Sequence, residues 1–549
     1  MSKRVLHLFQ GILQQQENLA EHSGFSPELL KTLRPHLVEN RFIDENGCLR
    51  SKGRNFLELL EHQELMIQKQ RQEHQNQVHT AILFVEKGST ARLRINKDQT
   101  VLAHNVQVFK QLGFEEIYVV TNDKHLYQSK DYRLITMDKS RSLVKQFGAW
   151  LQQAAIDKFI VIDGSRLFES RLIDLLNQTD RFPLAGRNRE NGHLLAVLKA
   201  DQTFFNHTGK AETLLEAITF GIDAKEQVIC LSPRSIRGVS KKNVKKRYQK
   251  ILKREAQYNQ IKAKVLVSQV TSRKEVEAIK QLGGLTNQNF HLEVQDKQVV
   301  ARIPGAFTQE FINRRYEDEN STLMSLLGIN TAHIYFNRDD GSKVNGYISN
   351  PLTYSPKVLE KEYYLEKSAQ LLKKLHSSGL VFVNDFDWQK ELTSYEQIVL
   401  KHEVKLPKDY EETKARVQKL YATLKDQTKV ACHCDALCEN FVIDKKTGRL
   451  FLVDWEYSGN NHPAWDLASL MVESQMSKKH QAAFLKAYGD IEVRDVRICM
   501  VIQDFIWSIW GLMKHAQRMD FYDYFELRYT RAKKNLRKLE EESHEDSTC

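Results

Sequence analysis

The sequence predicts a multidomain protein of mixed α/β and α+β class, and three observations support this prediction. The chain has 549 residues, whereas a single domain usually contains about 100–200. Near residue 79 the apolar residues change from helical spacing to short strands that alternate with helices. In the second half, a glycine-rich turn precedes a group of acidic and amide side chains, a pattern that neither earlier part shows.

The composition favours a soluble, cytoplasmic protein without membrane insertion. Apolar residues make up 41% of the chain and charged residues 28%, which is ordinary for a protein with buried cores. No apolar run approaches the ~20 residues that cross a bilayer, and the N-terminus has no small-residue cleavage site. The seven cysteines lack the spacing of a disulfide framework or a zinc site, so we expect reduced thiols.

The net charge of +11 favours anionic partners such as nucleotides, nucleic acids or anionic surfaces. Part of this charge lies in one run, residues 237–254, inside a segment that we assign to a basic helical linker over residues 234–264. The run is interpreted as a solvated helix face, and a nucleic-acid patch is the alternative.

Residues 1–75 have the pattern of short amphipathic helices around a polar turn. Ser26-Pro27 provides a cap and a first-turn proline for one of these helices. A hairpin turn is expected at Asn46-Gly47, because both residue types tolerate the positive φ of tight hairpins. Helices and a hairpin in this order resemble a winged helix-turn-helix.

A winged helix-turn-helix implies either DNA binding, with a regulatory role, or docking to a protein surface. The helix expected over residues 26–40 would enter the major groove of DNA. It offers only Lys31, Arg34 and His36 as candidate contacts, which is few for phosphate binding. Both interpretations stay open, with docking preferred.

Residues 78–233 have the pattern of a Rossmann-like domain with a doubly wound parallel sheet. Buried strands are expected at residues 80–85, 116–121 and 158–163, with an amphipathic helix over residues 100–112 after the first of them. Strands that alternate with helices favour parallel pairing, because the helix provides the crossover.

The segment after the first strand resembles the signature of sugar-phosphate and phosphocholine nucleotidyltransferases. In that family a glycine-rich loop, an arginine and a lysine hold a nucleotide triphosphate, and Gly88, Arg92 and Lys97 match those positions. Asp163 is also retained, but Ser165 stands where the family carries a magnesium ligand. Loss of a carboxylate weakens Mg²⁺ binding. We therefore expect either an inactive domain or one that couples phosphocholine to CTP.

Residues 265–549 contain the strongest signals, and the first is a glycine hairpin. Gly283-Gly284 begins a turn whose backbone amides can approach phosphate oxygens. Arg302, on the strand that pairs after it, supplies a cation for the α and β phosphates. The candidate nucleotide-binding residues are Gly284, Thr286, Asn287, Asn289 and Arg302.

The second signal is an acidic residue that precedes an asparagine and a further acid. Asp435 can accept the proton of an attacking hydroxyl. Asn440 and Asp454 offer hard oxygen ligands to the Mg²⁺ that ATP carries. A polar loop between two strands is the alternative, but the glycine hairpin upstream argues against it.

These motifs resemble the choline kinase and aminoglycoside phosphotransferase family, and within it the bacterial choline kinases. The resemblance extends over the last ~270 residues and includes the blocks that begin at Gly283, Arg302, Phe311, Leu375 and Asp454. It implies a protein-kinase-like phosphotransferase fold. It also implies that Glu317 pairs with Arg302, that Asp435 is the catalytic base, and that Asn440 and Asp454 bind the metal.

Aromatic residues near the C-terminus indicate choline as the acceptor. A quaternary ammonium cannot donate hydrogen bonds, so its site needs aromatic faces, each contributing about 0.5–2 kcal/mol. Trp507 and Trp510 are three residues apart, on one helix face, and with Tyr524 they match the choline cage of the family. Tyr457 and Glu473 match residues that line the same pocket.

Two other functions stay open at this point. A regulator would bind DNA through the N-terminal segment and sense nucleotide or choline through the other domains. A kinase of ethanolamine or another small amino alcohol would have the same catalytic residues, although a primary ammonium is better held by hydrogen bonds than by aromatic rings.

Overall fold

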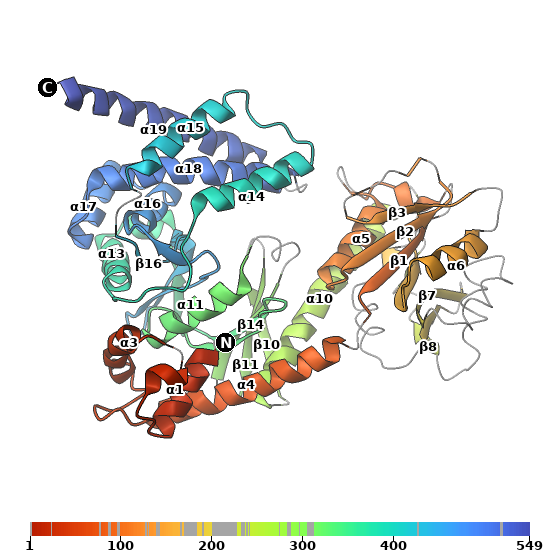
Figure 1. The fold of residues 1–549 in the computed structure, drawn as a ribbon, viewed down its shortest axis with the longest axis horizontal. Helices are drawn as coiled ribbons and strands as arrows, with labels where there is room; N and C mark the ends of the chain where they lie inside the picture. The colour runs from red at the N-terminus through yellow and green to blue at the C-terminus, as the bar shows by residue number, and fades with distance from the viewer. Residues whose placement is uncertain are drawn as a thin grey trace.

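The structure, a computed structural model, has three parts along the chain (Figure 1). The N-terminal helices lie against the C-terminal half, and the middle segment stands apart from both. The structure describes residues 3–23, 25–75, 78–85, 89–95, 99–123, 125–126, 129, 131–138, 143–164, 167–168, 184–188, 192–199, 228–231, 236–237, 240, 242–273, 275–282, 287–295, 297–304, 312–424, 428–516 and 520–548.

The N-terminal segment contains four helices. They are α1 (Lys3–Leu13), α2 (Leu19–Ser23), α3 (Pro27–Glu39) and α4 (Ser51–Gln75). The Ser26 hydroxyl accepts a hydrogen bond from the Leu29 amide and so caps the start of α3. Pro27 is the first residue of the helix, where the backbone N–H that proline lacks would have no partner within the helix. The cap and the proline together explain why α3 begins at this point.

A tight turn separates α3 from α4 at the place where the sequence predicts a hairpin. Ile43 and Leu49 form a single antiparallel bridge around this turn. Gly47 has a φ of +89°, which a residue without Cβ adopts at little cost. The turn is present with one bridge in place of a two-stranded wing, and the winged helix-turn-helix assignment stays a prediction.

The middle segment is built on a seven-stranded sheet with the strand order β3-β2-β1-β4-β7-β6-β8. The strands of this sheet are β1 (Thr80–Val85), β2 (Glu116–Thr121), β3 (Arg133–Thr136), β4 (Lys158–Asp163), β6 (Leu184–Asn188), β7 (Gly192–Lys199) and β8 (Val228–Leu231). The other described elements before residue 240 are η1 (Thr90–Arg92), α5 (Val101–Gln111), α6 (Leu143–Gln153), β5 (Leu167–Phe168) and β9 (Ile236–Arg237).

The strand directions agree with the prediction only in the first half of this sheet. The strands β1 to β4 are parallel, as the alternation of strands and helices predicts. However, β7 runs antiparallel to both β4 and β6, so the expected all-parallel sheet is wrong there. The reason is the short connection from β6 to β7, residues 189–191, because parallel neighbours need a crossover of a dozen or more residues.

A long helix, α10 (Val244–Thr271), connects the middle segment to the C-terminal half. Its first half packs Val244 and Ile251 against the middle segment, and its second half packs Val267 into the core of the next sheet. The predicted boundary between residues 264 and 265 therefore falls inside a helix. The linker is assigned from the basic residues in the first half of this helix. The helical spacing of apolar residues continues beyond that run to Thr271, so the helix extends past the end of the assigned linker.

The C-terminal half begins with a five-stranded antiparallel sheet of order β10-β11-β12-β14-β13, and α11 packs next to it (Figure 1). These elements are β10 (Glu277–Leu282), β11 (Gln288–Val294), β12 (Lys297–Ile303), β13 (His333–Phe336), β14 (Lys343–Gly346) and α11 (Arg314–Leu326). A small antiparallel sheet with one helix, followed by a larger helical lobe, is the arrangement expected of a protein-kinase-like phosphotransferase.

The helical lobe contains the remaining elements. They are β15 (Pro351–Thr353), α12 (Pro356–Leu359), α13 (Glu362–His376), α14 (Trp388–Lys401), α15 (Tyr410–Ala422), β16 (Val430–Cys432), η4 (Cys438–Asn440), β17 (Phe441–Asp444), β18 (Leu450–Leu452), β19 (Gly459–Asn461), α16 (Ala464–Glu473), α17 (Lys478–Tyr488), α18 (Val493–Ala516) and α19 (Tyr522–Thr548). Among the described helices, α18 alone has the length and apolar composition of a membrane span, and 83% of its most apolar window is buried inside the protein.

Candidate active site

Arg302 and Glu317 form a buried ion pair between the sheet and α11. Arg302, on β12, is 2% exposed, and Glu317, in the first turn of α11, is fully buried. Arg302 Nη1 lies 2.7 Å from Glu317 Oε1, and Nη2 donates a hydrogen bond to Oε2 at 3.0 Å. The structure thus brings together two residues that the sequence predicts as partners. Loss of either would deprive a buried charge of a close partner.

Two further cations, which sequence reasoning missed, bind the same carboxylate. Lys343 Nζ lies 3.0 Å from Glu317 Oε1, and Arg314 Nη1 lies 2.5 Å from Oε2. Burial alone would raise the pKa of Glu317, but Arg302, Lys343 and Arg314 outweigh it and hold that pKa well below its usual range. Arg314 was detectable from the sequence, because it is three residues before Glu317 on one helix. Lys343 was not, because only the β12–β14 pairing places it opposite Arg302.

The candidate nucleotide-binding asparagines lie at the start of β11. Asn289 is directly opposite Arg302 in the antiparallel register of β11 and β12, and Asn287 is buried just before the strand. The two other candidates of the glycine hairpin, Gly284 and Thr286, lie outside the described residues.

Asp435 lies in the loop after β16, and α16 holds the backbone of this loop. Asp466 accepts a hydrogen bond from the His433 amide at 2.7 Å and one from the Cys434 amide at 2.8 Å. Cys434 has a φ of +63°, a region that residues with a side chain rarely adopt. The two hydrogen bonds from Asp466 therefore fix a strained backbone one residue before the predicted base.

The surroundings of Asp435 are strongly acidic. Burial raises the pKa of Asp435 well above its usual range, and the carboxylates of Asp454, Glu473 and Glu456 act in the same direction. A carboxylate with a raised pKa is a stronger base, so it accepts a proton more readily. Asn440 donates a hydrogen bond through Nδ2 to the Asp435 carbonyl at 2.9 Å, so the two predicted residues are neighbours.

Three carboxylates converge where the metal is predicted. Oxygen atoms of Glu317, Asp454 and Glu456 lie within 4.8 Å of one another. Asp454 has a φ of +68° and a side chain that is 41% exposed, while its carboxylate lies 3.7 Å from Arg302 Nη1 and 3.5 Å from Lys343 Nζ. The cations beside Asp454 and Glu456 lie at 3.5–3.8 Å, further away than the three that bind Glu317, so these two carboxylates could also hold a divalent cation.

Glu456 is a further candidate ligand that the sequence prediction did not select. Its Oε2 atom is buried without a hydrogen-bond partner among the described residues, 3.5 Å from Arg314 Nη1 and 3.8 Å from Arg302 Nη1. Burial, with Asp454 and Glu317 nearby, raises the pKa of Glu456 to about 7. The cations near Glu456 therefore do not fully balance its charge. Together with Asp454 and Asn440, Glu456 offers the hard oxygen donors that Mg²⁺ prefers.

The aromatic residues predicted for the acceptor form one continuous group on α18, α19 and the loop after β18. Tyr457 and Trp507 meet edge to face, with ring centroids 5.4 Å apart. Trp507 and Trp510 are 6.3 Å apart, and Trp510 and Tyr524 are 6.1 Å apart. Asp435 raises the pKa of both Tyr457 and Tyr524, although burial is the larger cause for each. The aromatic group therefore lies near the predicted base.

Glu473, in contrast, is occupied by a cation of the protein itself. Arg528, which is 2% exposed, forms an ion pair with Glu473 and a second one with Asp504, at 3.0 Å. The carboxylate of Glu473 is therefore partly neutralised. A second carboxylate close to Tyr457 is Glu391 on α14, whose pKa burial raises to about 7. Sequence reasoning missed Glu391, because no motif connects α14 to the aromatic residues.

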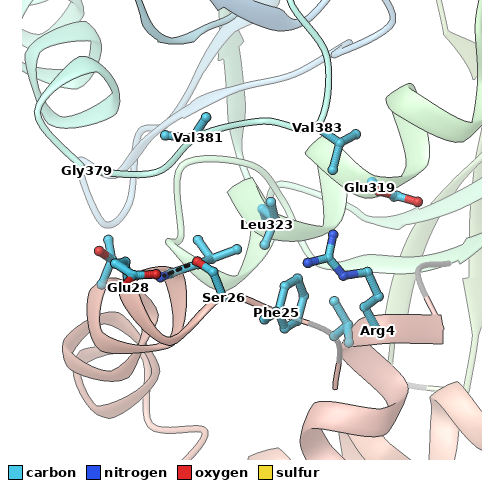
Figure 2. Close-up of a pocket in the computed structure, with 12 residues that line it drawn as sticks. Arg4, Phe25, Ser26, Glu28, Glu319, Leu323, Gly379, Val381 and Val383 are labelled. Carbon is cyan, nitrogen blue, oxygen red and sulfur yellow. Dashed lines mark hydrogen bonds between the residues drawn. The ribbon is translucent and has the colours of Figure 1, made fainter. Parts of the chain in front are cut away.

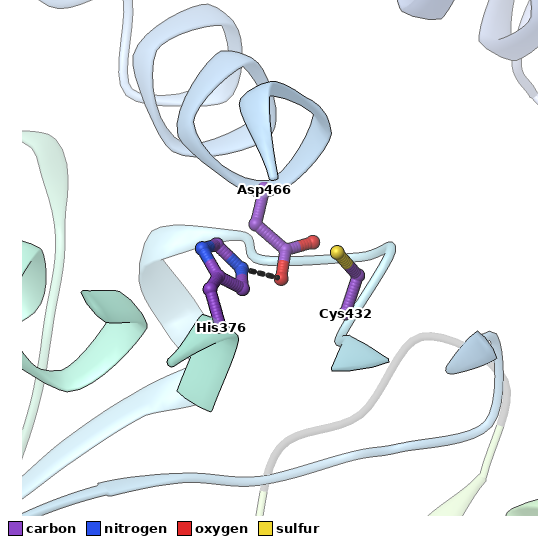
Figure 3. Close-up of side chains that lie close together, drawn as sticks. All are labelled: His376, Cys432 and Asp466. Atoms are coloured by element: carbon purple, nitrogen blue, oxygen red, sulfur yellow. Dashed lines mark hydrogen bonds and ion pairs between the residues drawn. The ribbon is translucent and has the colours of Figure 1, made fainter. Parts of the chain in front are cut away.

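A second group of metal-binding residue types lies behind the loop that carries Asp435, and consists of His376, Cys432 and Asp466 (Figure 3). His376 Nε2 lies 3.1 Å from Asp466 Oδ2, and His376 Nδ1 lies 2.9 Å from the Tyr488 hydroxyl. Burial raises the pKa of the Cys432 thiol well above its usual range, and the thiol donates to the Asn461 carbonyl. A protonated thiol is a poor metal ligand, so we assign this group to the support of the loop.

In the middle segment, the structure describes two of the four predicted nucleotide-binding residues. Arg92 Nη2 lies 2.7 Å from Asp123 Oδ2, so a bound triphosphate would compete with an internal carboxylate for this cation. Asp163 is the last residue of β4. Gly88 and Lys97 lie outside the described residues, as does Ser165.

Comparison with known proteins identifies relatives of the C-terminal half. Residues 276–491 match the family described as choline/ethanolamine kinase. Protein LicA of Haemophilus influenzae is 29% identical over 273 residues, which cover 46% of this chain and 100% of that protein. A probable ethanolamine kinase of Nematostella vectensis is 24% identical over 277 residues, 42% of this chain and 77% of that protein.

A solved structure is also similar to this half. The crystal structure of choline kinase LicA from Streptococcus pneumoniae is 34% identical and covers 50% of this chain and 98% of its own, with a TM-score of 0.46.

The matched range contains the catalytic candidates of the small sheet and of the loop after β16. It begins one residue before β10 and ends before α18, so Trp507, Trp510 and Tyr524 lie beyond it. The N-terminal and middle segments also lie outside it. The order of motifs, the two-lobed architecture and this match agree: the C-terminal half of the chain belongs to the choline/ethanolamine kinase family and is a kinase-like phosphotransferase.

Proposed function

We propose that the C-terminal half transfers the γ-phosphate of ATP to the hydroxyl of choline. The observation that carries the choice of acceptor is the aromatic group of Tyr457, Trp507, Trp510 and Tyr524 next to Asp435. Aromatic faces attract a quaternary ammonium without hydrogen bonds. The names of the two LicA proteins, one of them a choline kinase, support the same acceptor.

The nucleotide is proposed to bind between the small sheet and the helical lobe. Arg302 supplies positive charge to the α and β phosphates, while Glu317 and the carbonyl of Gly341 hold its guanidinium in place. Asn287 and Asn289 would contribute polar contacts at the start of β11, next to Arg302. Gly284 and Thr286 complete this proposed nucleotide site, which is expected to accept ATP.

Asp435 is proposed to be the general base. The choline hydroxyl gives its proton to the Asp435 carboxylate as its oxygen bonds to the γ-phosphorus. The bond from that phosphorus to the β–γ bridging oxygen then breaks, and ADP leaves with the electron pair. The neighbouring carboxylates favour protonation of Asp435, because protonation removes the repulsion between its negative charge and theirs.

Asp454 and Asn440 are proposed to hold Mg²⁺, with Glu456 as a third oxygen donor. Bound Mg²⁺ would neutralise charge on the phosphates of ATP. The left-handed backbone of Asp454 is consistent with this role, because strained residues are concentrated at ligand-binding positions. Lys343, 3.5 Å from Asp454, positions that carboxylate.

The test is a product assay on the full-length chain with ATP, Mg²⁺ and either choline or ethanolamine. We expect phosphocholine and ADP in equal amounts, with a higher kcat/KM for choline than for ethanolamine. A higher kcat/KM for ethanolamine would replace the proposed acceptor with the alternative that the family description includes. Absence of a phosphorylated product from either alcohol would contradict the proposal and favour a sensor that binds DNA.

The same assay with CTP added tests the middle segment. The pairing of Arg92 with Asp123, and Ser165 in place of a carboxylate, support a domain that does not couple phosphocholine to CTP. We therefore expect no CDP-choline. Its appearance would establish a second activity in the same chain. A cytoplasmic location and DNA binding by the N-terminal segment remain predictions from the sequence.

A further inference from the structure

The α3 helix lies with one face against the C-terminal half. Asn40, the C-cap of α3, donates a hydrogen bond through Nδ2 to the Leu326 carbonyl at 2.9 Å. The preceding residue, Glu39, has its Oε1 atom 3.7 Å from Lys374 Nζ on α13. A Cβ placed on Gly379 would lie 3.4 Å from Thr32 Cγ2, which shows how closely the backbone approaches. Residues 32, 39 and 40 share one side of the helix.

The hydrogen bond from Asn40 satisfies one end of the helix that carries Glu317. Leu326 is the last residue of α11, and the last carbonyls of a helix have no partner within it. Gly328 follows, and a Cβ at this position would collide with Arg449 Nη2 and lie 2.7 Å from Asn40 Oδ1, so both side chains pack closely against the turn after α11. The N-terminal segment therefore holds one end of α11, while Glu317 binds Arg302 at the other end.

A cavity lies within the contact between the N-terminal segment and the C-terminal half, although residues of both parts belong to one hydrophobic core. It measures about 260 Å³ and lies between Phe25 and Leu29 on one side and Leu323, Val381 and Val383 on the other (Figure 2). Protein interiors contain few voids larger than a water molecule, so this part of the contact is less densely packed than a typical interior. Val381 and Val383 are 64% and 44% exposed at its rim.

From this geometry we propose that the N-terminal segment is a docking module that positions α11, and through it the Glu317–Arg302 pair, for ATP binding. Its partner is the surface formed by the end of α11, α13 and residues 379–383 of the same chain. Asn40 is a positioning residue, because it acts on the nucleotide site through α11. DNA would reach this face of α3 only if the segment left its docked position.

The test compares two substitutions that each lower the net charge by one. Asn40→Asp removes the donor to Leu326 and places a carboxylate at the negative end of the α11 dipole. Lys31→Gln changes an exposed residue of α3 outside the docked face and is the matched control. In the full-length protein, Asn40→Asp should speed amide hydrogen exchange in α11 and reduce kcat/KM for ATP about tenfold. Lys31→Gln should change neither quantity.

Thr32→Arg provides an independent variant, since its long side chain would collide with the backbone at Gly379. It should reproduce both effects, and it replaces Asn40→Asp if that protein does not fold. Faster exchange in α11 with unchanged ATP kinetics, or no change in either, would overturn the proposal. This inference rests on the proposed function in one respect, that ATP is the phosphate donor, and it does not depend on the acceptor. Affinity for ADP with Mg²⁺, measured by calorimetry, therefore tests it even if choline is not the acceptor.

Discussion

At the scale of single residues, the charge around Asp435 is the strongest constraint on the chemistry. Burial and four nearby carboxylates raise the pKa of Asp435, whereas three cations around Glu317 lower the pKa of that residue. The two acids therefore behave in opposite ways although they belong to one site. Asp435 can exchange a proton, and Glu317 stays ionised as the partner of Arg302.

The first prediction concerns Asp435. Asp435→Asn should reduce kcat by about 100- to 10,000-fold, because general-base catalysis contributes roughly that factor. The KM for ATP should stay close to the wild-type value. The melting temperature should not fall, since the variant removes a charge from an acidic and buried position. Steady-state kinetics and thermal unfolding measure these quantities, and a variant that keeps half of the wild-type kcat would refute the role of Asp435.

The second prediction concerns the aromatic group. Trp507→Ala should raise the KM for choline about tenfold, because one cation–π face is lost. Trp507→Phe retains an aromatic face and is the matched control, for which we expect a smaller rise. Neither variant should change the KM for ATP. An equal increase in both KM values after Trp507→Ala would indicate a packing defect and contradict the cage.

At the scale of elements, α16 and α18 support the residues of the proposed site. Asp466, in the first turn of α16, fixes the loop in front of Asp435 through two backbone amides. Trp507 belongs to α18, which is buried over most of its length and packs against α14, α16 and α19. A helix of this composition resembles a membrane span in isolation, but in the fold it is the core on which the aromatic group is built.

The third prediction concerns Asp466. Asp466→Asn should lower kcat at least tenfold with little change in either KM. An asparagine side chain has one accepting oxygen in place of two, so it cannot accept from both the His433 and the Cys434 amides in the same way, and the loop before Asp435 is held less firmly. The variant should also be less stable at neutral pH. Burial opposes ionisation of Asp466, but its hydrogen bond and charge interaction with His376 and its interactions with His433 outweigh burial and lower the pKa of Asp466.

The sign of the pH dependence at Asp466 follows from that lowered pKa. A carboxyl group with a lowered pKa in the folded state stabilises it fully above the ordinary value of 3.8, and this contribution is lost as the pH falls further. The stability difference between wild type and Asp466→Asn should therefore be constant near neutral pH and shrink below pH 3.8. Urea unfolding at a series of pH values measures it, and a difference that grows in acid would contradict the assignment.

At the scale of the whole molecule, the described hydrophobic cores divide the chain into two units and not three. One core joins residues of α1 to α4 with residues of the helical lobe and α11. A second core joins the small sheet with the second half of α10, and Met66 and Ile67 of α4 pack against it. The cores of the middle segment contain only its own residues and the first half of α10. The N-terminal segment therefore belongs with the kinase-like half, although the middle segment separates them in sequence.

The fourth prediction follows from this division. Calorimetric unfolding of the full-length protein should show two transitions, one of them containing both the N-terminal segment and the kinase-like half. ADP with Mg²⁺ at 100 times its Kd should stabilise that unit by about 2.7 kcal/mol and leave the other transition unchanged. A shift of both transitions would mean that the middle segment also binds the nucleotide or is coupled to its site.

The sequence alone determined the local chemistry of this protein. Helix and strand periodicities located several of the described elements, and short motifs predicted Arg302, Glu317, Asp435, Asn440 and Asp454 as a kinase-type set. These features depend on residues close together in the chain, where spacing and residue type carry the information. The same reasoning predicted the parallel strands β1, β2 and β4 from the alternation of strands with helices.

Only the tertiary structure decided which distant residues meet. Lys343 joins Glu317 through sheet pairing, Arg528 neutralises Glu473 from another helix, and β7 reverses direction after a short connection. The docking of α3 on α11 connects Asn40 with a carbonyl 286 residues further along the chain. Such contacts arise when apolar faces are buried against each other, and no local pattern records which surfaces pair.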